Sequence, residues 1–304
     1  MSHRIPPKED RRVLGIGLVL LGFVSLTIVD SCVKWLTLHG GLPTLQVVFI
    51  RYAAQVALVL ALFLPAQGTA LVETRRLPLE ILRAVALLGS TVLNFFAILF
   101  LPLTITAAIS FTSPLILVAL SVPLLGEIVG WRRWLAIALG FVGILIVVRP
   151  SSGTFSPAVL LCLLAAICNA FYMLLTRKLA GVDSTATQQF YVGVVSTLAV
   201  FPFALDNWVW PTDNITWMVF GLIGVIGFVG HQFIIVAHRF APASVLAPFT
   251  YVQIISMTAS SWLIFNQPPE IWLYIGAPLV IASGLYIWFR ERQLGKLAVA
   301  EERT

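Results

Sequence analysis

Charged side chains inside otherwise apolar stretches are the first candidates for chemistry in this sequence. Asp30 and Lys34 lie four residues apart, and Arg51 lies in the next apolar stretch. A spacing of four puts two side chains on one face of a helix, where an acid and a base can pair. One acid against two bases would attract an anionic group such as a carboxylate. The structural alternative is a salt bridge at the edge of an apolar layer, with the long basic side chains reaching out to polar surroundings.

His231 is the one histidine deep in an apolar stretch. Histidine titrates near neutral pH, which makes His231 a candidate for proton coupling. The structural alternative is a histidine that is simply held by a hydrogen bond to a neighbouring helix.

Uncharged polar side chains in the middle of apolar stretches form a second group of candidates. Amides can orient the polar ends of a ligand, and an aromatic ring can cover an apolar or cationic group. Some of these side chains must instead bond from helix to helix. The candidates for ligand binding are Asn94, Ser110, Asn169, Tyr172, Tyr251 and Gln253.

The sequence lacks the residue patterns that catalysis requires. It has no HExxH pair, no recognisable nucleophile with a base, no two close carboxylates and no GxxxxGK[ST] loop. Cys32, Cys162 and Cys168 lie within apolar stretches, where a disulfide framework or a CxxC metal site has no support. We expect no enzyme activity, no catalytic residue, no metal ion and no cofactor.

The elements that must position these side chains are membrane-spanning helices. Hydrophobic residues make up 59% and charged residues 11% of the 304 residues, and the mean hydropathy is +0.97. Soluble proteins average about 25% charged residues, so a soluble fold is excluded. Apolar runs of about 20 residues cross a bilayer. They predict ten spans, over residues 13–37, 43–65, 83–102, 105–126, 132–149, 157–177, 186–205, 215–237, 243–265 and 271–289.

The basic residues predict how these spans are oriented, because Lys and Arg stay preferentially on the cytoplasmic side of short loops. Of 19 basic residues, 16, including Arg83, are predicted on the side of both termini, and only Arg149 on the other side. The remaining two, Lys34 and Arg51, lie inside spans. Residues 1–12 and 291–304 are therefore expected to be cytoplasmic tails of a multi-pass protein of a bacterial inner membrane. The net charge of +6 then reflects topology and not a surface for nucleic acid.

An internal repeat divides the chain into two halves. Residues 131–149 and 272–290 align without a gap, and a shift of one residue brings Ala97 onto Ala237. Five spans are an odd number, so the second copy must enter the membrane from the opposite side. The predicted fold is an all-α integral membrane protein with ten transmembrane helices in two inverted five-helix repeats. The repeats cover residues 13–149 and 157–290.

With this organisation the chain resembles the EamA-type transporters of the drug/metabolite transporter superfamily, which have two tandem five-helix domains. The resemblance covers about residues 12–290. It rests on Lys34, Phe49–Arg51, Ala107, Pro114, Leu124–Glu127, Gly140–Pro150, Arg177–Lys178 and, most specifically, Ala237–Tyr251. The second half departs from the pattern, since Asn266 and Gln267 stand where the Gly-Glu of the first half would recur. A symmetric pair of carboxylates is therefore not expected.

The resemblance implies a secondary transporter that moves a small metabolite by alternating access of the two halves around a central cavity. We expect an amino acid as the substrate and export as the direction. The alternative is uptake of a nucleoside-like or methyl-donor metabolite, and the alternatives of another class are a channel and a membrane scaffold. The expected partners are a small-molecule substrate and the lipid bilayer, with no nucleic acid. The sequence fits a monomer but does not define the oligomeric state.

Overall fold

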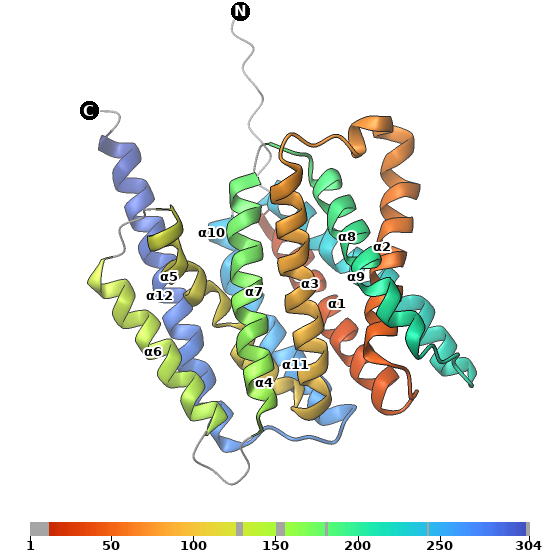
Figure 1. Cartoon of the computed structure of the whole chain (residues 1–304). Helices are drawn as coiled ribbons and strands as arrows, with labels where there is room; N and C mark the ends of the chain where they lie inside the picture. Colours follow the sequence, from red (N-terminus) through yellow and green to blue (C-terminus); the bar gives the residue numbers. More distant parts are fainter. Residues whose placement is uncertain (1–11, 126–129, 150–155, 180–181, 242, 302–304) are drawn as a thin grey trace, which may run out of the picture.

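The computed structural model describes residues 12–125, 130–149, 156–179, 182–241 and 243–301, and all of its regular elements in these ranges are helices (Figure 1). The predicted N-terminal tail up to residue 11, the end of the C-terminal tail and the Gly126–Glu127 motif lie outside the described residues. The helices are α1 Arg12–Leu38, α2 Thr44–Gln67, η1 Gly68–Leu71, α3 Leu77–Phe100, α4 Leu103–Ser110, α5 Ser113–Leu125, α6 Trp131–Val148, α7 Ala158–Leu179, α8 Thr185–Asp206, α9 Asn214–Phe240, α10 Ala243–Leu246, η2 Ala247–Tyr251, α11 Val252–Leu263 and α12 Ile271–Glu301.

Nine stretches of the described chain are long and apolar enough to cross a membrane. They confirm the predicted all-helical membrane fold. Two of the ten predicted spans are not continuous helices: the fourth is divided into α4 and α5, and the ninth into α10, η2 and α11. Each break lies at a proline, Pro114 in the first half and Pro248 in the second. Proline has no N–H to donate and disfavours helical geometry in the preceding residue, so it favours a kink or a break in an α-helix.

Helix packing follows the predicted repeat. The corresponding elements are α1, α2, α3, α4–α5 and α6 in the first half, and α7, α8, α9, α10–α11 and α12 in the second. The helix α1 packs on α9, and exchanging the halves gives the contact of α3 with α7, which also exists. In the same way α2 packs on α8 and α6 on α12. The most extensive contacts between the halves thus have their symmetric counterparts, as a pseudo-twofold axis requires.

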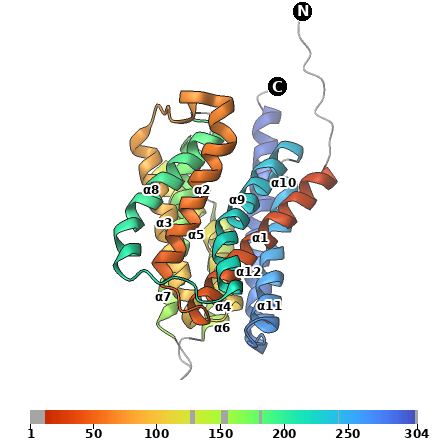
Figure 2. The ribbon, with the colours of Figure 1, turned by 90° about the vertical axis from the view of Figure 1, so that its right-hand side faces the viewer.

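The figures show how this symmetry is laid out. The start of α1 and the end of α12 lie on the same side of the molecule, at the top of Figure 1, whereas α7 begins at the bottom, so the halves run in opposite senses. We call the face with the start of α1 and the end of α12 the terminal face. In Figure 2, α2, α3 and α8 lie on one side and α1, α10 and α11 on the other.

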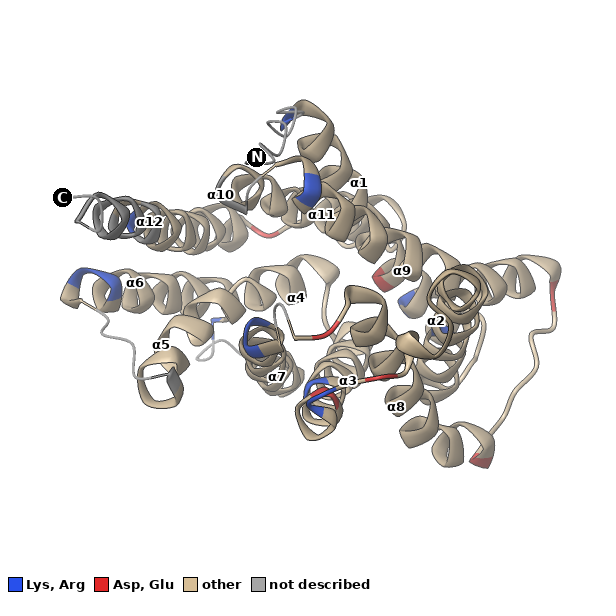
Figure 3. Cartoon of the chain, turned by 90° about the horizontal axis from the view of Figure 1, so that it is seen from above, with Lys and Arg blue, Asp and Glu red and all other residues tan. Residues whose placement is uncertain are grey.

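The pair α6 and α12 lies at one edge of the molecule when it is seen from above (Figure 3). Its two helices approach closely at Gly143, where an added methyl group would lie 2.8 Å from the carbonyl oxygen of Gly276. Small residues permit such contacts between membrane helices. The α6–α12 pair therefore connects the two halves at the periphery, and the other helices surround the centre.

Candidate functional site

A cavity of about 520 Å³ lies between the two halves, and we call it the central cavity. Side chains from α1, α2, α3, α4, α5, α7, α8, α9, η2 and α11 line it, and those described in α6 and α12 do not. Eight of the ten residues proposed from the sequence meet there, although they come from both halves. They are Asp30, Arg51, Asn94, Ser110, Asn169, Tyr172, His231 and Gln253.

Arg51 on α2 offers the central cavity a buried guanidinium group. The residue is 6% exposed. Its Nη2 donates a hydrogen bond of 3.3 Å to Thr91 Oγ1, and its guanidinium lies 4.2 Å from the centre of the Tyr52 ring. Its Nε has no hydrogen-bond partner, and no described carboxylate lies within ion-pair distance. Guanidinium groups match carboxylates and phosphates geometrically, so Arg51 is ready to bind an anionic group.

Asp30 on α1 supplies the opposite charge in the same cavity. Its Oδ1 accepts a hydrogen bond of 3.3 Å from Nδ2 of Asn94 on α3. Arg51 is near enough to act electrostatically on both Asp30 and His231. The cavity therefore combines an acid, a free cationic donor and a histidine contributed by α1, α2 and α9. This combination can hold a ligand with charges of both signs.

Lys34 does not form the expected pair with Asp30. Its ammonium group instead donates to the carbonyl oxygen of Leu101 at 2.8 Å and to Gln267 Oε1 at 3.0 Å, and the residue is only 1% exposed. Leu101 follows directly after the end of α3, where a carbonyl lacks a partner within the helix, and the long lysine side chain reaches it. Lys34 thus lies outside the lining of the central cavity and connects the two halves.

Tyr251 also lies outside the lining, behind Phe111. The two rings stack with their centres 4.8 Å apart and an angle of 24° between their planes. Phe111 itself faces the central cavity. Tyr251 can therefore influence a ligand through the position of Phe111.

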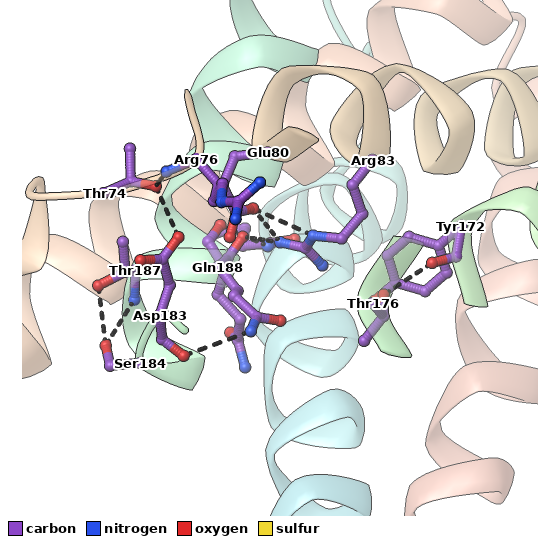
Figure 4. A network of polar contacts seen from close by, with 12 residues as sticks. Thr74, Arg76, Glu80, Arg83, Tyr172, Thr176, Asp183, Ser184, Thr187 and Gln188 are labelled. Carbon is purple, nitrogen blue, oxygen red and sulfur yellow. Dashed lines mark hydrogen bonds and ion pairs between the residues drawn. The ribbon is translucent and has the colours of Figure 1, made fainter. Parts of the chain in front are cut away.

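An ion pair that was not predicted from the sequence lies at the other end of α3 (Figure 4). Arg83 was assigned to a cytoplasmic loop, but α3 begins at Leu77 and carries Arg83 inward, where it is 2% exposed. Its Nη2 lies 2.9 Å from Glu80 Oε2 and donates to the backbone oxygen of Gln188. Its guanidinium lies 5.5 Å from the Tyr172 ring centre and borders the central cavity. The spacing of three between Glu80 and Arg83 was a usable signal for an intrahelical pair.

Contacts between the halves lie toward both ends of the central cavity. At the terminal face, Thr74 Oγ1 donates to Asp183 Oδ2 at 2.6 Å, beside the Arg83 contact (Figure 4). At the opposite face, Gln46 exchanges two hydrogen bonds with the backbone of Val209, at 2.7 and 3.0 Å. The Lys34–Gln267 bond also lies at that face. In alternating access, one of the two sets must open while the other stays closed.

Metal-binding chemistry has no support in the part of the chain that the structure describes. No group of three or more His, Cys, Asp or Glu residues there could hold a metal ion. Cys32, Cys162 and Cys168 are free thiols.

The model of the EamA-like transporter family matches residues 13–149 and 156–289. The chain therefore belongs to the EamA-like transporter family and carries two EamA domains. It is a secondary transporter of small metabolites and a multi-pass membrane protein, and not an enzyme. A solved crystal structure with 18% sequence identity aligns with a TM-score of 0.63 over 93% of this chain and 97% of its own, which supports the fold.

Three curated relatives show which substrates similar proteins carry. An S-adenosylmethionine uptake transporter of Rickettsia prowazekii is 27% identical over 92% of this chain and 94% of its own. A riboflavin transporter of Vibrio cholerae is 27% identical over 88% and 91%, respectively. A pseudopaline exporter of Pseudomonas aeruginosa is 26% identical over 88% and 94%. Amino-acid export, the first expectation from the sequence, has no specific support among these relatives.

Proposed function

We propose that this carrier takes up a nucleoside-like metabolite that also bears an amino-acid group, with S-adenosylmethionine as the first candidate. The single observation that carries the proposal is Arg51, a buried guanidinium in the central cavity with an unused Nε donor. Two observations support it: Asp30 lies in the same cavity, and similar proteins include S-adenosylmethionine uptake transporters. This was the alternative expected from the sequence.

The charged end of the substrate fits the part of the central cavity near Asp30 and Arg51. Arg51 would bind the carboxylate, while Asp30 and the oxygen of Asn94 would face the ammonium or sulfonium group. Hydrogen bonds to charged groups contribute about 1.5–3 kcal/mol each. An uncharged ligand would offer neither group an opposite charge, so we expect the site to favour a zwitterion.

The ring of the substrate fits the part of the cavity near Asn169 and Tyr172. Arg83 borders that part of the cavity, and Asn94 borders the part near Asp30 and Arg51. Arg83 and Asn94 are eleven positions apart on α3, which corresponds to about 16 Å along the helix. An amino acid alone would fill only one part. A nucleoside base could stack on Tyr172, an interaction of about 1–3 kcal/mol in proteins that bind bases, while the Asn169 amide bonds to its edge. The length of the cavity thus favours the larger metabolite.

His231 is the candidate for proton coupling. His231 lies in the central cavity with Asp30 and Arg51, so a proton on its ring would alter the charge that the substrate meets. If His231 couples transport to protons, His231→Gln flattens the dependence of uptake on pH.

The basic residues support an orientation in the membrane. With Arg83 reassigned, the sequence still predicts 15 of the 19 basic residues on the side of both termini. This supports cytoplasmic termini in the inner membrane.

The test compares two ligands, one with a carboxylate and one without it, as a labelled substrate and as a competitor. In proteoliposomes, we expect S-adenosylmethionine to be taken up, and its decarboxylated form to compete about ten- to a hundredfold more weakly. In Arg51→Gln, the affinity for S-adenosylmethionine should fall by a similar factor, while that for the decarboxylated form stays the same. The control is Arg132→Gln, an exposed arginine on α6 away from the cavity. Equal competition by both ligands in the unaltered protein would contradict the proposal.

A further inference from the structure

A second cavity, of about 460 Å³, lies beside the central cavity where three helices end or begin. Its walls come from the end of α2, the start of α8 and the end of α9, including Gln67, Thr185 and Arg239. These parts of the three helices all lie at the terminal face (Figure 1). The second cavity therefore lies between the centre of the molecule and the aqueous phase on that side.

One hydrogen bond between two neutral amides marks the boundary of the two cavities. Gln189 on α8 lines both of them, as does Ile235 on α9. Gln232 lines the second cavity, and its Nε2 donates to Gln189 Oε1 at 3.2 Å. Gln55 on α2 also contacts Gln189: its Nε2 donates a hydrogen bond of 3.3 Å to the backbone oxygen of Gln189. The Gln189 and Gln232 side chains therefore lie where the two cavities meet.

A stronger contact joins α3 to α8 nearby. Arg83 on α3 donates to the backbone oxygen of Gln188 on α8, and two hydrogen bonds to Glu80 of the same helix hold its guanidinium in place. Charge-assisted hydrogen bonds of this kind are about twice as strong as neutral ones. The neutral Gln189–Gln232 bond is therefore the one that opens more easily.

We propose that the second cavity is a vestibule through which the substrate passes between the central cavity and the terminal face, with Gln189 and Gln232 as its gate. Arg239, exposed in the vestibule, attracts the carboxylate of the substrate. The identity of the substrate rests on the proposed function, whereas the route does not. An anionic group thus meets Arg239 first and Arg51 afterwards.

The route can be tested without a substrate by labelling a cysteine in the central cavity. Ser90→Cys lines that cavity, and Cys32, Cys162 and Cys168 are replaced by alanine to remove other thiols. A hydrophilic methanethiosulfonate is added at the terminal face of proteoliposomes, and a cleavable tag after Thr304 reports which face is outward. Thr185→Trp, which fills the vestibule from an exposed position, should slow labelling about tenfold or more, equivalent to at least 1.4 kcal/mol.

Two further variants give the opposite change and the control. Gln232→Ala removes the gate bond and should speed labelling about threefold, the factor that corresponds to an average hydrogen bond between membrane helices. Leu198→Trp puts the same bulk on the outer face of α8, where Leu198 is 67% exposed, and should change nothing. Labelling that is equally fast in Thr185→Trp and Leu198→Trp would overturn the route.

Uptake measured with the same proteins separates this inference from the proposed function. If uptake of S-adenosylmethionine falls with labelling in Thr185→Trp, both stand. If the protein with the natural Thr185 takes up no S-adenosylmethionine while Thr185→Trp still slows labelling, the proposed substrate is wrong and the route stands. Thr185→Cys, modified with a bulky reagent after folding, should lose uptake in the same way and removes any effect of tryptophan on folding.

Discussion

Phe111 and Tyr251 occupy equivalent positions of the two repeats and stack on each other, with their ring centres 4.8 Å apart. The 140-residue offset that aligns Ala97 with Ala237 also aligns these two residues. Each ring lies at a break in a helix, Phe111 between α4 and α5 and Tyr251 at the end of η2. The pseudo-twofold axis therefore passes between the rings, beside the central cavity. A change in this stacking would be transmitted to both halves.

Gly284 on α12 gives a way to disturb this pair. A methyl group there would collide with the hydroxyl of Tyr251 but would lie 3.6 Å from its Cζ, an ordinary contact. We expect Gly284→Ala to slow transport and to lower stability by about 0.5–1.5 kcal/mol, the contribution of an aromatic pair. Adding Tyr251→Phe should restore both, measured as uptake and as thermal unfolding. The control is Gly221→Ala, which has open space around it. Failure of Tyr251→Phe to rescue would contradict this role.

Removing one partner of the Glu80–Arg83 pair should be strongly destabilising because both side chains are buried. Arg83→Leu leaves the Glu80 carboxylate buried without its charged partner, which typically costs about 3–5 kcal/mol. Replacing both, with Glu80→Leu and Arg83→Leu, should destabilise the protein less than Arg83→Leu alone. Thermal unfolding of the purified variants measures the difference, with Arg132→Leu as the exposed control. A double variant that is less stable than Arg83→Leu would contradict the role of this pair.

The Lys34–Gln267 bond should control opening at the face opposite the terminal face. Gln267→Glu would give the buried ammonium a carboxylate partner, and charge-assisted bonds are about twice as strong as neutral ones. We expect a higher unfolding temperature and slower transport, because this face must then break an ion pair to open. Gln267→Met, which removes the acceptor at similar size, should have the opposite effect on stability. Equal transport rates in Gln267→Glu and the unaltered protein would exclude this bond as a gate.

Asp213 should make the start of α9 sensitive to acid. The hydroxyl and N–H of Thr216 and the N–H of Ile215 donate hydrogen bonds to its carboxylate, and they hold the pKa of Asp213 below its usual value. A lowered pKa means that the stabilisation is complete above the unfolded-state pKa of about 3.9 and is lost as the pH falls through the lower folded-state value. Amide exchange at Ile215 and Thr216, corrected for intrinsic rates, should therefore accelerate in acid. Asp213→Asn keeps a cap without a charge and should abolish this dependence.

Much of the fold could be predicted because a bilayer restricts it. Apolar runs and an odd number of spans per repeat are enough for an inverted ten-helix protein. The breaks at Phe111 and in η2 are local, and prolines permit either a kink or a continuous helix. Pro278, for example, lies within the unbroken α12. Which of the prolines breaks a helix depends on packing between the halves.

The candidate site could be predicted only where side chains point into the cavity from the middle of a span. Asp30 and Asn94 fulfil this condition, and the structure brings them together. Lys34 does not, because its long side chain reaches Leu101, a partner 67 residues away that no spacing rule reveals. Arg83 was missed because the charged residues before it resemble a loop, whereas the helix begins at Leu77. Long side chains near helix ends are thus the least predictable part of the site.

The most direct measurement of the central claim is uptake by purified protein in proteoliposomes, with labelled S-adenosylmethionine, riboflavin and a panel of amino acids, with and without a pH gradient. We predict saturable uptake of S-adenosylmethionine that depends on Arg51 and Asp30 and is strongly reduced in Arg51→Gln and Asp30→Asn. Both variants should insert into the membrane to the same extent as the unaltered protein. Free amino acids should compete only weakly, because they fill one end of the cavity. Saturable flux of amino acids without uptake of S-adenosylmethionine, or full activity in both variants, would contradict it.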